Sequence, residues 1–179
     1  MNLNSTYDKV LAFSTEAHSG QKRKYSNEDY ITHPIAVAKI VEENGGTDSM
    51  IFAALLHDVI EDTDVTEVEL LSFLHELPNT HVAIEVFEYV RDLTDIYTSE
   101  NFPDWNRAKR KGLEAIRLGS TGNRVQTIKC ADLFHNTLSI TSHDPKFAKV
   151  YLAEKKVMLD LMTDGLPELR DKCINQLLQ

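Results

Sequence analysis

Cysteine is scarce, because the chain of 179 residues has only Cys130 and Cys173. Two thiols cannot build a disulfide framework, and they lie too far apart in sequence for a Cys-x-x-Cys site. This usage is typical of a reducing compartment. The sequence also has no apolar run long enough to span a membrane, and its N-terminus has no apolar signal core. We therefore expect a cytoplasmic protein with no membrane partner.

The chain also has few positively charged residues relative to its acidic ones. Lysine and arginine number 19 against 28 aspartates and glutamates, which gives a formal net charge of −9. A general nucleic-acid binder needs a basic surface to displace counterions from phosphates, so this class is excluded. Internal repeats, a glycine-rich phosphate loop and a GxSxG elbow are missing as well. Any polyanionic substrate must meet lysines and arginines that are concentrated locally.

Alternation of apolar and polar residues, the mark of half-buried strands, is not present over any useful length. Apolar residues recur instead at helical spacing, which predicts an all-α fold, and the length favours one domain over 1–179. The stretch 95–104 is the longest irregular segment and a candidate lid. The expected helices run from Ser5 or Thr6 to His18, 33–44, 48–62, from Thr66 to before Pro78, 81–94, 105–118, 125–140, 145–162 and 167–178. We expect the second to stop at Gly45, the fourth to begin with a capping box of Thr66 and Glu69, and the sixth to be capped by Asp104.

The segment 53–62 carries His57, Asp58, Glu61 and Asp62 within an arc of about 140° on one helix. Three carboxylates on one arc repel one another, and no lysine is interspersed among them. A bound divalent cation would offset this repulsion, and histidine with aspartate is a suitable ligand pair. The alternative is an acidic, solvent-exposed face. Two ligands do not complete a site, so at least two more are expected elsewhere.

Asp132 is the candidate for a further ligand, because it lies between Ala131 and Leu133 in an apolar helix. A buried carboxylate without a partner is costly. Lys129, Asn136 and Ser139 follow the same polar side of this helix at i−3, i+4 and i+7 from Asp132.

Two basic segments stand out in the acidic chain. Arg107, Lys109, Arg110 and Lys111 form the densest cluster, and the range 23–24 supplies Arg23 and Lys24 on a polar loop. Taken alone, each segment is more typical of an ordinary solvated surface.

Three stretches together resemble a known family: His33-Pro34, the run from Ala53 to Thr63, and the run from Lys129 to Asn136. They are similar to the HD hydrolase domain of the Rel/SpoT alarmone enzymes, and the likeness extends from Ala17 to about Ser139. The resemblance implies an all-helical HD-domain bundle that binds one divalent ion, commonly manganese. It also implies hydrolysis of the guanosine alarmones (p)ppGpp, in which the 3′-pyrophosphate leaves as a unit to give GDP or GTP.

The same resemblance assigns roles to individual residues. It implies metal ligation by His33, His57, Asp58 and Asp132, and catalysis by Glu61 and Asp62. It places Arg23, Lys24, Asn136 and Ser139 near the nucleotide, and their charge makes Lys24, Arg107, Arg110, Lys111 and Lys129 candidates to neutralise phosphates. The length of the chain leaves no room for a synthetase domain, so we expect a small stand-alone hydrolase.

Departures from the family pattern fall around the nucleotide rather than the metal. They are Asn27-Glu28-Asp29 in the first loop, Leu133 after the aspartate, and Thr94-Asp95-Ile96. Three alternatives therefore stay open. One is an HD-domain phosphatase acting on another nucleotide, such as NADPH or a nucleoside monophosphate. The others are a non-catalytic nucleotide or alarmone sensor and a purely structural helical module.

Overall fold

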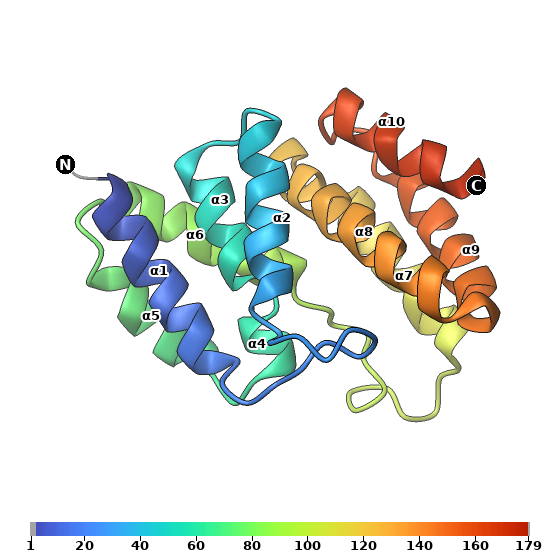
Figure 1. The fold of residues 1–179 in the computed structure, drawn as a ribbon, viewed down its shortest axis with the longest axis horizontal. Coiled ribbons are helices and arrows are strands. Elements are labelled where there is room, and N and C mark those ends of the chain that lie inside the picture. The colour runs from blue at the N-terminus through green and yellow to red at the C-terminus, as the bar shows by residue number, and fades with distance from the viewer. Residues whose placement is uncertain (1–2, 179) are drawn as a thin grey trace. The chain divides into compact units, whose positions relative to one another are not determined.

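The computed structural model describes residues 3–178, and within this range the chain is built from helices without a strand. The only strand-like pairing there is an isolated bridge between Lys22 and Asp29. The chain divides between Thr94 and Asp95 into two compact units, shown by their helices in Figure 1. The predicted all-α fold is confirmed, whereas the predicted single domain stays a prediction.

The first unit is organised around its third helix. Four consecutive residues, 53–56, are fully buried because α1, α2 and α6 all pack on α3. A helix that is apolar on every side belongs in such a central position. The helices of this unit are α1 (Leu3–Ala17), α2 (Thr32–Glu43), α3 (Asp48–Leu56), α4 (Val59–Asp62), α5 (Glu67–His75) and α6 (Thr80–Leu93).

A tight reversal joins α2 to α3. Gly45 has a φ of +79°, and its N–H donates to the Glu42 carbonyl, while the N–H of Gly46 donates to the Val41 carbonyl. These two bonds form a Schellman motif, which ends helices at a glycine in the left-handed region. A Cβ on Gly46 would lie 2.3 Å from Val41 Cγ1 and 2.9 Å from the Val41 carbonyl oxygen. The reversal therefore requires both glycines and fixes how α3 runs back along α2 (Figure 1).

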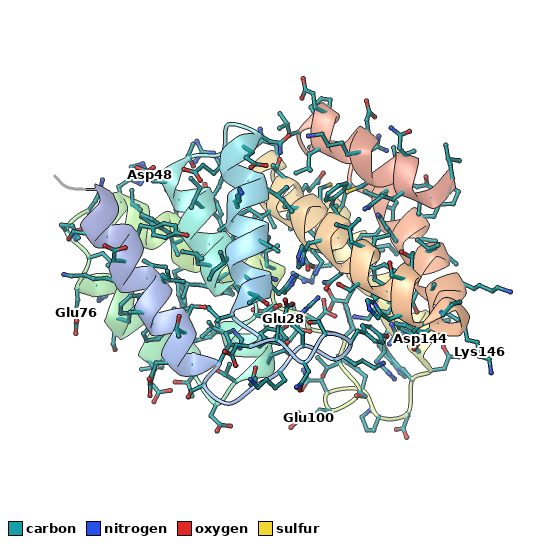
Figure 2. The ribbon with its side chains drawn as sticks, in the orientation of Figure 1. Glu28, Asp48, Glu76, Glu100, Asp144 and Lys146 are labelled. Atoms are coloured by element: carbon teal, nitrogen blue, oxygen red, sulfur yellow. The ribbon has the colours of Figure 1, made fainter. Side chains whose placement is uncertain are left out.

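The second unit packs α8 against α9 and α10, and α7 against α9. Asp144 caps α9 by accepting the N–H of Phe147, and Figure 2 labels Asp144 and Lys146 at this turn between α8 and α9. Gln126 of α8 accepts the N–H groups of residues 164 and 165 and so fixes the turn after α9. The elements of this unit are α7 (Arg107–Gly119), α8 (Asn123–His143), α9 (Pro145–Leu161), α10 (Pro167–Asn175) and the 3-10 helix η1 (Gln176–Leu178).

Most expected helices are confirmed, but three details are wrong. The first helix begins before Ser5, and the helix expected over 48–62 is interrupted after Leu56. Asn106, not Asp104, caps α7 by accepting the N–H of Lys109. Both residue types are good caps, so sequence alone does not choose between them. Among the helices within residues 3–178, none is both long enough and apolar enough to cross a bilayer.

Candidate metal centre

Two imidazoles and a carboxylate converge in the first unit. His33 comes from the first turn of α2, and His57 and Asp58 lie between α3 and α4. Asp58 Oδ2 is 3.0 Å from His57 Nε2 and 3.6 Å from His33 Nε2, and the two rings meet edge to face. Both histidines are buried, at 1% and 3% exposure.

His57 and Asp58 lie where the helical segment is interrupted. Consecutive side chains on a regular helix point about 100° apart, so neighbouring residues cannot readily share one ion. The chain leaves α3 at Leu56, and Asp58 adopts a φ of −97° and a ψ of −3° before α4 begins. Within this turn Asp58 Oδ2 lies 3.0 Å from His57 Nε2, although the two residues are neighbours in the sequence.

A backbone carbonyl of the preceding helical turn fixes the tautomer of His57. Its Nδ1 lies 2.8 Å from the carbonyl oxygen of Ala54, and a carbonyl can only accept. Nδ1 therefore carries the proton and Nε2 presents a lone pair toward Asp58 and His33. A second hydrogen bond that orients a ligating imidazole in this way is usual in metal sites.

The three residues fit a divalent cation. Donor atoms that share one ion at bond lengths of about 2.0–2.2 Å lie roughly 3–3.5 Å apart. The ligand atoms of His33, His57 and Asp58 all lie within 4.8 Å of one another, so small side-chain movements would bring them to an ion. Two imidazoles with one carboxylate suit manganese, iron, cobalt, nickel or zinc.

The predicted catalytic pair follows shortly after this cluster in the sequence. Glu61 and Asp62 are the last residues of α4, and the Asp62 N–H donates to the Asp58 carbonyl at 2.8 Å. Burial raises the pKa of the Asp62 carboxyl, and the negative charge of Asp58 raises it further. The Tyr30 hydroxyl lies between the two aspartates, and burial beside them raises the pKa of this phenol too. Sequence reasoning did not single out Tyr30, although it lies only three residues before His33.

Asp132, the fourth predicted ligand, belongs to the second unit. It is buried, at 5% exposure, and has two partners on its own helix: Lys129 Nζ at 2.9 Å from Oδ2 and Asn136 Nδ2 at 2.6 Å from Oδ1. A cavity of about 140 Å³ lies beside these three residues and Lys111. The structure thus gathers four predicted site residues around one hollow in the second unit.

The other predicted substrate contacts are more scattered. Arg23 lies over the Tyr30 ring, with its Cζ 5.7 Å from the centroid, and Lys24 lies over the ring of Tyr25 on the same loop, where Figure 2 labels Glu28. The guanidinium of Arg110 donates to the Trp105 carbonyl just before α7. Ser139 is partly buried on α8, and its carbonyl accepts from His143 Nδ1.

Two further residues line the cavity and were missed at the level of sequence. They are Tyr151 and Lys155, both on α9. The Lys155 ammonium donates to Thr137 and Gln176, and burial lowers the pKa of this lysine. Its position offered a signal, because Lys155 lies three residues after Leu152 and four before Leu159, on the apolar stripe of the helix.

The family is now established by comparison with known proteins. The HD domain family matches residues 10–158, most of the chain. The chain therefore belongs to the HD domain family. A relative of this chain is the guanosine-3′,5′-bis(diphosphate) 3′-pyrophosphohydrolase MESH1 of Xenopus tropicalis, which is 32% identical over 139 residues, covering 75% of this chain and 69% of the relative.

Longer proteins match as well. The bifunctional (p)ppGpp synthase/hydrolase SpoT of Escherichia coli is 37% identical over 131 residues, or 73% of this chain and 17% of SpoT. A probable guanosine-3′,5′-bis(diphosphate) 3′-pyrophosphohydrolase of Synechocystis is 30% identical over 150 residues, or 83% of this chain and 18% of the relative. The chain thus spans less than a fifth of the length of these two proteins.

Solved structures confirm the fold. The structure described as a metazoan ortholog of SpoT that hydrolyzes ppGpp matches with a TM-score of 0.80 at 23% identity, covering 98% of this chain and 95% of that one. The protein lmo0812 of Listeria monocytogenes matches with a TM-score of 0.65 at 20% identity, over 86% and 96% of the two chains.

Proposed function

We propose that this protein is a metal-dependent hydrolase that removes the 3′-pyrophosphate from the guanosine alarmones (p)ppGpp, giving GDP or GTP and pyrophosphate. The observation that carries the proposal is the cluster of His33, His57 and Asp58, with Glu61 and Asp62 one helical turn beyond it. The relatives named above support the substrate, since three of them carry names for this chemistry. Two buried free thiols support a reducing compartment such as the cytoplasm.

The proposed ligand set is completed by Asp132. The three clustered residues supply two nitrogens and one oxygen, and Asp132 would add a second carboxylate, for which manganese is a suitable ion. Bound there, the ion would lower the pKa of a water molecule and polarise a phosphoryl oxygen. When no ion is bound, Lys129 and Asn136 on α8 are the partners of the Asp132 carboxylate.

Glu61 and Asp62 are the proposed catalytic acids. The oxygen of a water molecule bonds to the phosphorus attached to O3′, the bond between this phosphorus and O3′ breaks, and O3′ gains a proton. One carboxylate holds the water and accepts its proton, and the other delivers a proton toward O3′. The raised pKa of Asp62 suits the proton-delivering role.

Lysines and arginines of the second unit are the proposed phosphate partners. Beside the cavity Lys111 pairs with Asp95 at 2.5 Å, and Arg107 pairs with Glu154 through two bonds of 2.7 and 2.8 Å. Phosphate oxygens would compete with these carboxylates for the same donors. The proposed substrate contacts are Arg23, Lys24, Arg110, Lys111, Lys129, Asn136 and Ser139.

The decisive experiment separates the products formed from ppGpp by purified, manganese-loaded protein. GDP with pyrophosphate is the expected pair, and stepwise release of orthophosphate would contradict the proposal and indicate a phosphatase. Tight ppGpp binding without turnover would indicate a sensor instead. Running NADPH and a nucleoside monophosphate in parallel tests the other nucleotide substrates.

The first prediction concerns the acid pair. The double variant Glu61→Gln/Asp62→Asn should lose at least about a hundredfold in kcat, because it removes proton transfer at both sites. Its manganese content, measured by elemental analysis, should equal that of the wild type. The control is Asp64→Asn, which removes an exposed carboxylate from the same acidic run and should leave turnover unchanged. Loss of manganese from the double variant would show instead that the pair ligates the ion.

A further inference from the structure

The Tyr30 hydroxyl occupies a position between two functional carboxylates. It lies 2.7 Å from Asp58 Oδ2 and 2.8 Å from Asp62 Oδ2, both within hydrogen-bond distance. Asp58 Oδ2 is also the atom nearest to both imidazoles of the metal cluster. One phenol oxygen therefore connects an atom of the proposed metal site to the carboxylate proposed to transfer a proton.

Tyr30 is itself fixed from several sides. Its N–H donates to the Gln21 carbonyl at 3.0 Å, and its carbonyl accepts the N–H of His33 at 2.9 Å. Its ring stacks on His18 at 4.7 Å between centroids and meets the His33 ring edge to face at 6.0 Å. The hydroxyl thus has little freedom to move away from Asp58 and Asp62.

A second connection reaches the backbone of the same aspartate. Gln21 Nε2 donates to the Asp62 carbonyl at 2.6 Å, and Gln21 Oε1 accepts from His18 Nδ1 at 2.9 Å. His18 Nε2 is buried and makes no hydrogen bond within residues 3–178. His18 consequently acts as a packed structural histidine that orients Gln21, and Asp62 is held by both its side chain and its main chain.

We propose that Tyr30 is a positioning residue that holds the Asp62 carboxylate at a fixed distance from the metal-ligating oxygen of Asp58, with Gln21 restraining the Asp62 backbone. The inference rests on the proposed function and deepens it. Without the hydroxyl, the Asp62 side chain loses this hydrogen bond, while its backbone keeps the bond from Gln21 at the end of a four-residue helix. Its carboxylate would then sample rotamers that are unsuited to proton transfer, while substrate binding would be unaffected.

The test is Tyr30→Phe, which removes one oxygen and keeps the stacked ring. We expect kcat for ppGpp to fall about 10–100-fold, as for outer contacts of a metal site, with KM within twofold and manganese content unchanged. In an Asp62→Asn background the same substitution should cost less than about twofold, because the two residues act as a unit. Tyr7→Phe on α1 is the control and should retain full activity. If Gln21→Met also lowers kcat at constant KM, the backbone restraint is supported.

Full activity of Tyr30→Phe, loss of manganese, or an undiminished effect in the Asp62→Asn background would each overturn the proposal. Crystal structures of the wild type and Tyr30→Phe add a readout that needs no turnover, since the Asp62 carboxylate should move or become disordered in the variant. A wild type that is inactive on ppGpp, together with a displaced Asp62 in the variant, would refute the proposed function and support the positioning role. An unmoved Asp62 would refute the positioning role.

Discussion

Single side chains in this protein often take a position that no local pattern indicates. The clustered residues His57 and Asp58 were predictable because they form a dense polar group on an apolar helix. Asp132 was a candidate because it is an acid between apolar neighbours, and His33 because it matches a family motif. Tyr30 gave no comparable signal, since a tyrosine near a helix start is common and only tertiary contacts bring its hydroxyl to the two aspartates.

Lys155 is the residue whose burial has the clearest energetic consequence. It is 1% exposed, and its ammonium donates to Thr137 Oγ1 at 2.8 Å and Gln176 Oε1 at 2.6 Å. Lys155→Met keeps the length of the side chain but leaves the Gln176 oxygen without this donor. We expect the free energy of unfolding to fall by about 1–3 kcal/mol, measured by urea denaturation.

The neighbouring lysine provides the matched control. Lys156 pairs with Asp160 on the exposed side of α9, with both side chains more than half exposed. Exposed pairs at i, i+4 contribute only about 0.3–0.5 kcal/mol, so Lys156→Met should be nearly neutral. An equal decrease in the free energy of unfolding of the two variants would contradict the importance of burial.

At the scale of elements, the sequence predicted helix caps and glycine stops better than it predicted which helix faces are buried. The capping box of Thr66 and Glu69 and the end of α2 at Gly45 are confirmed. The break after Leu56 was missed, because nothing in its local sequence disfavours a helix. Val150 and Val157 belong to the apolar pattern that predicts α9 but are each 47% exposed, since α9 has apolar residues on more than one side.

The capping box makes a pH-dependent contribution that can be measured. Hydrogen bonds from the backbone and side chain of Thr66 lower the pKa of Glu69 in the folded protein. The resulting stabilisation is present above the pKa of the unfolded chain, about 4.3, and is lost as the pH falls through the lower folded value. Thr66→Ala should cost on the order of 1 kcal/mol at pH 7, with a smaller difference from the wild type at pH 3 in urea denaturation. If the difference in unfolding free energy between the wild type and the variant were the same at pH 3 as at pH 7, ionised Glu69 would not contribute to the capping box.

At the scale of the whole molecule, the HD domain match from residue 10 to residue 158 includes parts of both compact units. Periodicity could predict the helices of each unit but not the division between Thr94 and Asp95, because the irregular stretch that follows resembles any long loop. The cavity beside Asp132 was likewise not predictable, since it depends on how α8 and α9 pack.

Metal binding should appear as stability of the folded chain. A ligand that binds only the folded state at a hundredfold excess over its Kd adds about 2.7 kcal/mol, so manganese should raise the Tm of the chelator-treated protein. His57→Ala should abolish this rise, because it removes one nitrogen of the cluster. Asp132→Asn should reduce the rise if the second unit supplies the fourth ligand, and an unchanged rise would contradict that assignment. Calorimetry of the wild type and the two variants, with and without manganese, measures these changes in Tm.

The reversal at Gly45 and Gly46 has a consequence for how this sequence can drift over evolutionary time. Every codon change that replaces a glycine introduces a Cβ, and at position 46 that carbon would collide with the carbonyl of Val41. Relief of the collision would shift α3 along α2, and with it His57 relative to His33. Variation at this surface turn is therefore restricted, because a side chain at position 46 would disturb the geometry of a cluster to which neither glycine belongs.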